Sequence, residues 1–173
     1  MTAREREEYR ALRATIRERG TARSWTFVAG LSVWAGLTLA VLEWPAIPVA
    51  ALLPLLVLAG SFEAVFALHV AVERIGRYIQ VSYEERDGTA RNWEHTAMAF
   101  GRPLAGTGAD PLFAVVFGLA TLFNFLTAAA ADGTRVELSV IGAAHALMLG
   151  RIVAARRLAA RQRQADLERF RLV

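Results

Sequence analysis

Two apolar stretches of the sequence contain ionisable side chains that could do chemistry. Glu63 and His69 lie in GSFEAVFALHVAVERIGRYIQ, Gly60 to Gln80, and His145 lies in the apolar segment from Val136 to Ala155. An ionisable side chain inside a membrane is costly, so it is by default a candidate for function. Because histidine titrates near neutral pH, a carboxyl group and an imidazole in contact could relay protons. The residues of such a proton or cation pathway would be Glu63, His145, His69, Glu73, Arg151 and Asn124.

Helical rise gives the depth of each residue if these segments cross a membrane as helices. Glu63 lies ten residues before Glu73, and His145 lies ten residues before its apolar segment ends, so both are about 15 Å from the inner boundary, near the midplane. His69 and Arg151 lie only about 6 Å from that boundary by the same count. We therefore expect Glu63 to pair with His145, and His69 and Glu73 to pair with Arg151.

A structural role competes with the relay. A hydrogen bond between Glu63 and His145 could do no more than fix which helices pack and in which register, and the sequence favours this role. A relay needs polar groups that reach both surfaces, and only Asn124 and two nearby threonines extend the path outward. A haem held by His69 and His145 is disfavoured, because their estimated depths differ by about 9 Å.

Familiar catalytic and metal-binding motifs are missing. Nothing matches a metalloprotease HExxH, a phosphate-binding loop, a GxSxG elbow or a dinucleotide fingerprint, and the chain has no cysteine. A metal site could be drawn from Glu84, Glu85, Glu94 and His95. Adjacent side chains such as Glu94 and His95 point about 100° apart on a helix, which disfavours binding of one ion by both. We expect no enzyme activity, no metal and no cofactor.

Small residues recur every three or four positions on three of the apolar segments. These small-residue ladders are Ser32, Gly36 and Ala40; Gly60, Ala64 and Ala67; and Gly142, Ala146 and Gly150. Such spacing lets helices approach closely in lipid. Glu63 and His145 adjoin two of the ladders, so we expect both to face a neighbouring helix. Three ladders are also more association surface than one bundle needs, which predicts assembly with other chains.

The elements that would position these residues are four apolar segments. Residues 25–42, 46–72, 111–131 and 136–155 come close to or exceed the roughly 20 residues that a helix needs to cross a bilayer. The first segment has no charged residue and only three hydroxyl side chains, too few for the polar stripe of a helix in water. The sequence predicts an all-helical protein with a bundle of four transmembrane spans.

Arginine distribution predicts the orientation. The chain has no lysine; seven arginines precede the first span, five lie in residues 73–110, and seven lie from Arg151 onward. Arg135 is the only arginine in the two opposite connections. By the positive-inside rule both termini and the central loop are cytoplasmic. Four glutamates among the first 23 residues argue against a cleaved signal peptide.

Three cytoplasmic parts flank the four-span domain, residues 24–158. Residues 1–23 read as an amphipathic helix with a capping box at Thr2 and Glu5 and a stop at Gly20. Residues 159–173 read as a basic continuation of the last helix, and residues 93–100 of the loop 73–110 as a short interfacial helix.

The role expected from these features is that of a small integral membrane protein. Arginine without lysine suggests a bacterial chain, and therefore the inner membrane. We expect it to act by helix packing, as a homo-oligomer or as an accessory subunit of a larger membrane complex. Anionic lipid headgroups are the expected partners of the arginine-rich termini, and no nucleic acid is expected. A channel or transporter is the alternative, and a haem subunit the minor one.

Overall fold

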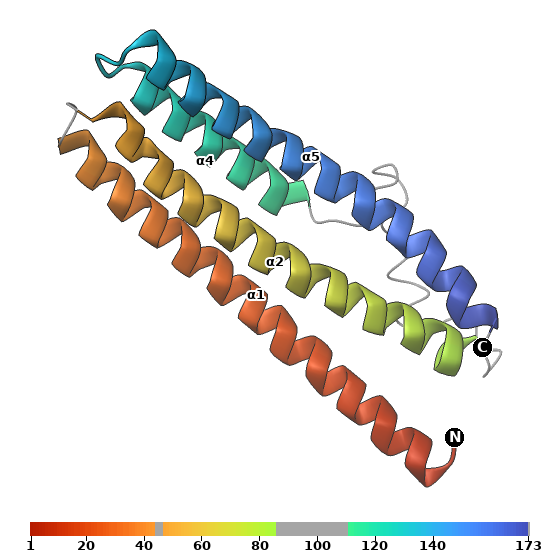
Figure 1. The fold of residues 1–173 in the computed structure, drawn as a ribbon. Coiled ribbons are helices and arrows are strands. Elements are labelled where there is room, and N and C mark those ends of the chain that lie inside the picture. The colour runs from red at the N-terminus through yellow and green to blue at the C-terminus, as the bar shows by residue number, and fades with distance from the viewer. Residues whose placement is uncertain (44–46, 86–110, 173) are drawn as a thin grey trace. The chain divides into compact units, whose positions relative to one another are not determined.

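The computed structural model describes residues 1–43, 47–85 and 111–172 (Figure 1). Its elements, in chain order, are α1 (Ala3–Glu43), the short helix η1 (Pro48–Ala51), α2 (Leu52–Ile79), the π-helical turn η2 (Gln80–Glu84), α4 (Pro111–Ala129) and α5 (Arg135–Leu172). No strand occurs in these ranges, so the all-helical prediction is confirmed for the described chain. The short helix predicted at residues 93–100 lies outside the described residues.

Helix α1 begins at the predicted capping box. The Thr2 amide donates to Glu5 Oε2 at 2.6 Å, and the Glu5 amide donates to Thr2 Oγ1 at 3.2 Å. The predicted stop at Gly20 is wrong, because α1, which is 41 residues long, runs through Gly20 and ends at Glu43. Glycine inside a helix costs only about 1 kcal/mol relative to alanine, and it ends a helix only where the chain turns left-handed. The residues that follow Gly20 all tolerate a helix.

A tight turn joins α4 to α5. The Ala131 amide donates to Ala128 O at 3.3 Å, and the Gly133 amide donates to Ala131 O at 2.8 Å. Thr134 and Glu137 then form a second capping box, with the Thr134 amide 2.8 Å from Glu137 Oε2. From there α5 runs for 38 residues to Leu172, so the predicted helical tail is confirmed.

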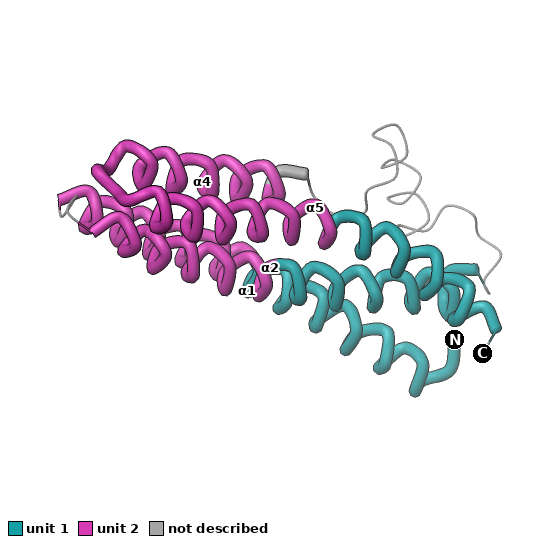
Figure 2. Tube along the Cα trace, turned by 45° about the horizontal axis from the view of Figure 1, so that its top comes forward, with its two compact units in different colours: residues 1–23, 66–109, 156–173 teal, residues 24–65, 110–155 magenta. Residues whose placement is uncertain are grey.

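The chain divides into two compact units (Figure 2). Unit 1 comprises residues 1–23, 66–109 and 156–173, and unit 2 comprises residues 24–65 and 110–155. Each of the helices α1, α2 and α5 contributes residues to both units.

Unit 2 has an apolar interior and an apolar exterior. Leu58, Phe117 and Ile141 are fully buried. Phe27 and Phe62 each meet Phe117 edge to face, with ring centroids 5.6 Å and 5.4 Å apart. Two helix segments approach closely at Gly30, where an added Cβ would overlap the Ser61 side chain. Apart from Met1, Leu158 and Leu172, every exposed large apolar side chain of the described residues belongs to unit 2. Such a surface is unusual for a protein in water.

Unit 1 has a more polar interior. Its buried apolar residues in the described chain are Ile79 and Ala159, and beside them lie the buried polar residues Arg77, Gln80, Glu84 and Asp166. In η2 the Glu85 amide donates to Gln80 O at 2.9 Å, across five residues instead of four. This widened turn follows directly after α2 and sets the direction of the side chains there.

Three helices are long and apolar enough to cross a membrane: α1, the segment Pro48–Glu84 that includes α2, and α5. Helix α4 is shorter, with its apolar part at Phe113–Ala129. The length and composition of these three helices support the prediction of a membrane protein.

Candidate functional site

Glu63 forms an ion pair with Arg151 in unit 2. Arg151 Nε lies 2.7 Å from Glu63 Oε1, and Arg151 Nη2 donates to Glu63 Oε2 at 2.7 Å. Two parallel hydrogen bonds of this kind make the strongest arginine–carboxylate geometry. The pair is not enclosed, because 48% of the Glu63 side chain and 37% of the Arg151 side chain are exposed. Two full charges are thus held on the outer surface of the apolar unit.

The predicted pairing of Glu63 with His145 is corrected by this contact. The depth estimate aligned Glu73 with Ala155, an offset of 82 residues between α2 and α5, whereas Glu63 and Arg151 are 88 residues apart. Six residues of helix correspond to about 9 Å, which is enough to change the partner. The proton-relay hypothesis was based on a contact between Glu63 and His145, whereas the structure gives each of these residues other partners.

His145 instead bonds to Asn124 inside unit 2. Asn124 Nδ2 donates to Ala51 O and to His145 Nε2, both at 2.9 Å. Because His145 Nε2 accepts, its proton lies on Nδ1, which donates to Ile141 O at 2.7 Å. Asn124 is 0% exposed and His145 is 3% exposed. The arrangement is a neutral, buried bridge between α4 and α5 that fixes their register.

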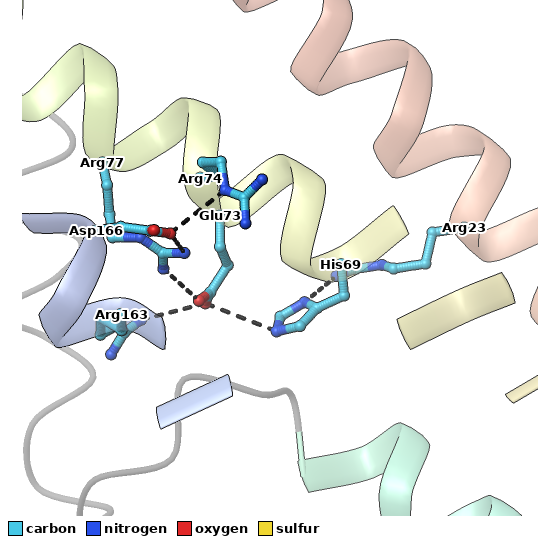
Figure 3. Close-up of polar contacts among 7 residues, drawn as sticks. All are labelled: Arg23, His69, Glu73, Arg74, Arg77, Arg163 and Asp166. Atoms are coloured by element: carbon cyan, nitrogen blue, oxygen red, sulfur yellow. Dashed lines mark hydrogen bonds and ion pairs between the residues drawn. The ribbon is translucent and has the colours of Figure 1, made fainter. Parts of the chain in front are cut away.

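Arg77 is the centre of a charged cluster in unit 1 (Figure 3). Its side chain is 1% exposed, and it donates to Glu73 Oε2 at 2.8 Å and to Asp166 Oδ2 at 2.9 Å. Arg163 adds a contact of 3.2 Å to Glu73, and Arg74 one of 3.5 Å to Asp166. We call these five residues the Arg77 cluster. It connects α2 to α5 through charges that are mostly removed from solvent.

His69 extends the Arg77 cluster towards α1. Arg23 Nη1 donates to His69 Nδ1 at 2.9 Å, and His69 Nε2 lies 3.7 Å from Glu73 Oε1. The predicted contacts of His69 and Glu73 with Arg151 are therefore replaced by contacts with Arg23, Arg77 and Arg163. The same error in helix offset explains the change.

Neither histidine of the described chain presents a ring nitrogen ready for a metal. Both nitrogens of His145 are hydrogen-bonded, and those of His69 face Arg23 and Glu73. Within the described residues no group of three or more metal-ligating side chains comes together. Glu94 and His95 lie outside those residues.

The small-residue ladders point outward in the structure. Gly60, Ala64, Ala67, Ala146 and Gly150 are exposed, as are Ser32 and Gly36. A Cβ added at Gly36, Gly60 or Gly150 would meet nothing within 4 Å, and one at Gly142 would only touch Phe125. Ala40 is partly buried. The close approach that these residues permit is therefore not used for packing inside the chain.

Sequence reasoning missed the Arg77 cluster, although signals for it existed. Glu73 and Arg77 are four residues apart, the spacing of an ion pair along a helix. Asp166 lies seven residues after Ala159, on the buried stripe that also contains Ile152 and Ala155. That position marks an inward-facing carboxylate in a tail that otherwise reads as solvated.

No protein-family model, curated protein or solved structure matches this chain.

Proposed function

We propose that this chain is a four-span integral membrane protein that works by assembling with a second copy of itself, without catalysing a reaction. Helix α4 is the third span along the chain: its 19 residues include no charged side chain and measure about 28 Å as a helix, close to the thickness of the hydrocarbon layer. The apolar exterior of unit 2 is the surface that lipid would cover.

Both termini lie in the cytoplasm under this proposal, and the membrane is the bacterial inner membrane. The arginines of the described chain support the orientation, because Arg135, the first residue of α5, is the only one beside the α4–α5 turn. Exposed arginines of the tail, such as Arg157, Arg161 and Arg169, would meet anionic headgroups.

The ion pair of Glu63 and Arg151 is the observation that supports assembly. A charged pair exposed to hydrocarbon is expensive, and intramembrane charges normally face protein or a water-filled cavity. Glu63 lies between the exposed small residues Gly60 and Ala64, and Arg151 follows Gly150. Charged and small side chains therefore adjoin each other on the exposed surface of unit 2.

A second copy is the occupant that this surface fits best. In a two-fold symmetric contact, each copy presents the same patch to the other. Glu63 of one copy can then approach Arg151 of the other, so the patch is complementary to itself in charge. The small residues allow the two backbones to come close enough for van der Waals packing, which drives helix association in lipid.

The test is the molar mass in a mild nonionic detergent, measured by light scattering over a range of protein concentrations. We expect a mass of at least two chains. Ala64→Leu and Ala146→Leu should weaken association about tenfold or more, because each overfills a close interface. Ala129→Leu is the matched control: Ala129 is also exposed, but it lies on α4, where no ladder occurs, and it should leave the mass unchanged.

Three outcomes would contradict the proposal. A single-chain mass at every concentration excludes assembly with a second copy. Equal effects of Ala64→Leu, Ala146→Leu and Ala129→Leu exclude the ladders as the interface. Stoichiometric co-purification of a different protein, with no self-association, makes the chain a subunit of a larger complex instead.

Orientation has its own test, because the chain has no native cysteine. A membrane-impermeant maleimide should label Asp132→Cys in intact spheroplasts, and should label Arg169→Cys only after permeabilisation. Both positions are exposed, so accessibility is set by the side of the membrane. The reverse labelling pattern would overturn the proposed orientation.

A further inference from the structure

Unit 1 contains a cavity of about 740 Å³ that the Arg77 cluster does not line. It lies at η2, which follows α2, and beside the first turns of α1 and the last turn of α5. Its volume is within the range of small-molecule sites, about 300–1,000 Å³. Because every lining residue belongs to unit 1, the cavity is a feature of that unit alone.

Three aromatic side chains line this cavity: Tyr78, Tyr83 and Phe170. The rings of Tyr78 and Tyr83 meet edge to face with centroids 6.1 Å apart, and those of Tyr78 and Phe170 with centroids 5.6 Å apart. These contacts fix the three rings against one another, so the wall is preformed. Aromatic faces carry partial negative charge and attract cations.

Carboxylates supply full negative charge at the same cavity. Of the described residues, Glu5, Glu8 and Glu85 line it, together with one guanidinium, that of Arg171. Arg171 Nη2 bonds to Glu85 Oε1 at 2.9 Å and offsets that carboxylate. Glu8 instead accepts a hydrogen bond of 3.1 Å from the neutral Tyr78 hydroxyl, so its charge stays at the cavity.

A second hydroxyl orients Glu8. The pKa of Tyr83 is raised to about 12 by burial, by a hydrogen bond with Glu8 and by the negative charge of Glu8. Tyr83 is therefore a neutral donor at physiological pH. Two tyrosines thus hold one carboxylate in place, at an aromatic wall, without neutralising it.

We propose that this cavity binds a soluble organic ammonium cation. The Glu8 carboxylate would pair with the ammonium group, and Tyr78, Tyr83 and Phe170 would contact its methyl or methylene groups. An anion or an uncharged ligand would meet an excess of negative charge. The inference rests on unit 1 alone and does not depend on the assembly proposed for unit 2.

The experiment is a calorimetric titration of the full-length chain in a maltoside detergent, since detergents with choline headgroups would themselves compete. Choline and spermidine are the probes, and 3,3-dimethylbutan-1-ol is the neutral isostere of choline. We expect at least one cation to bind with a stoichiometry of one per chain, and the isostere to show no binding. Absence of binding by both cations, or equal binding of choline and its isostere, overturns the proposal.

Matched variants locate the binding site. Glu8→Gln should weaken binding about fivefold or more through loss of the charge pair, and Tyr83→Leu should weaken it severalfold through loss of the ring. Glu7→Gln makes the same charge change one residue away, outside the lining, and should have no effect. Glu8 is exposed, so its replacement should not prevent folding.

Equal losses of cation affinity in Glu7→Gln and Glu8→Gln would show that the effect comes from general surface charge. That result would overturn the proposed site. Binding that requires a choline phospholipid in nanodiscs, with no response to soluble amines, would overturn the assignment of a soluble ligand.

Discussion

Unit 1 and unit 2 bury different kinds of polar side chain. The buried polar residues of unit 1 in the described chain are Arg77, Gln80, Glu84 and Asp166, and those of unit 2 are Thr38, Thr121, Asn124 and His145. Three of the first four carry a full charge, whereas the second four are hydrogen-bonded neutral groups. Burial of charge is tolerable next to water but very costly in hydrocarbon.

The exteriors differ in the opposite sense. Exposed leucine and valine side chains cover unit 2, and exposed charged side chains cover unit 1. Unit 2 therefore has the kind of surface expected in lipid, and unit 1 the kind expected in water. Stability in unit 1 should depend on charge pairing, and stability in unit 2 on close packing and neutral hydrogen bonds. The following predictions test that difference in order of decreasing effect.

The largest effect is expected in unit 1 from Arg77→Met. It leaves Glu73 and Asp166 without their buried cation and should lower the free energy of unfolding by about 3–5 kcal/mol. Urea denaturation in detergent, followed by circular dichroism, measures it. Arg74→Met is the control, because Arg74 is 56% exposed and should contribute less than about 1 kcal/mol. Equal effects of the two variants would show that burial of Arg77 does not matter.

In unit 2, Gly30→Ala should destabilise by about 1–3 kcal/mol, because the new Cβ overlaps the Ser61 side chain and the helices must move apart. Thermal unfolding of the variant provides the measurement. Gly36→Ala is the matched control: its Cβ would meet nothing, so stability should stay equal or rise by up to about 1 kcal/mol through helix propensity. A neutral Gly30→Ala would mean that this close contact does not form.

Asn124→Leu should cost about 1 kcal/mol, the usual size of a buried hydrogen bond between membrane helices. It removes the bonds to Ala51 O and His145 Nε2 while keeping the volume apolar. Thr121→Val removes only a bond to Phe117 O in its own helix and should cost less. If Asn124→Leu were as damaging as Arg77→Met, the contrast between neutral and charged interiors would fail.

The smallest effect concerns Tyr83. Its pKa is raised from 10.0 to about 12, first by burial and then by Glu8, so the folded state holds this proton more tightly than the unfolded state. Its stabilising contribution is complete below pH 10 and is lost as the pH rises towards 12. The difference in phenolate absorbance between the chain and Tyr83→Phe should have its midpoint near pH 12. A midpoint at pH 10 would remove the basis for the role assigned to Glu8.

Sequence predicted what depends on neighbours along the chain. The capping box of Thr2 and Glu5 and the length of α5 are local properties, and both are confirmed. The outward direction of the small residues could not be read in advance, since a ladder suits contacts within a chain and between chains equally well.

The contacts between α2 and α5 could not be predicted reliably, because they depend on the axial offset between these helices. The sequence does not contain that offset. An error of six residues in the estimated offset led to the prediction of His145 as the partner of Glu63, whereas the partner in the structure is Arg151. Arg77 and Asp166 were missed for the same reason. Each looks like an ordinary surface charge until the other helix is placed beside it.

The capped turn between α4 and α5 has a consequence for how such a protein is made. Only a few residues separate the two helices, and the amides of Ala131, Gly133 and Thr134 are already bonded within the turn or to Glu137. Under the four-span proposal, a connection this short does not allow one of these helices to span the bilayer while the other lies in water. The pair should therefore leave the ribosome and enter the lipid as a single helical hairpin, so that biogenesis of this half is one step instead of two.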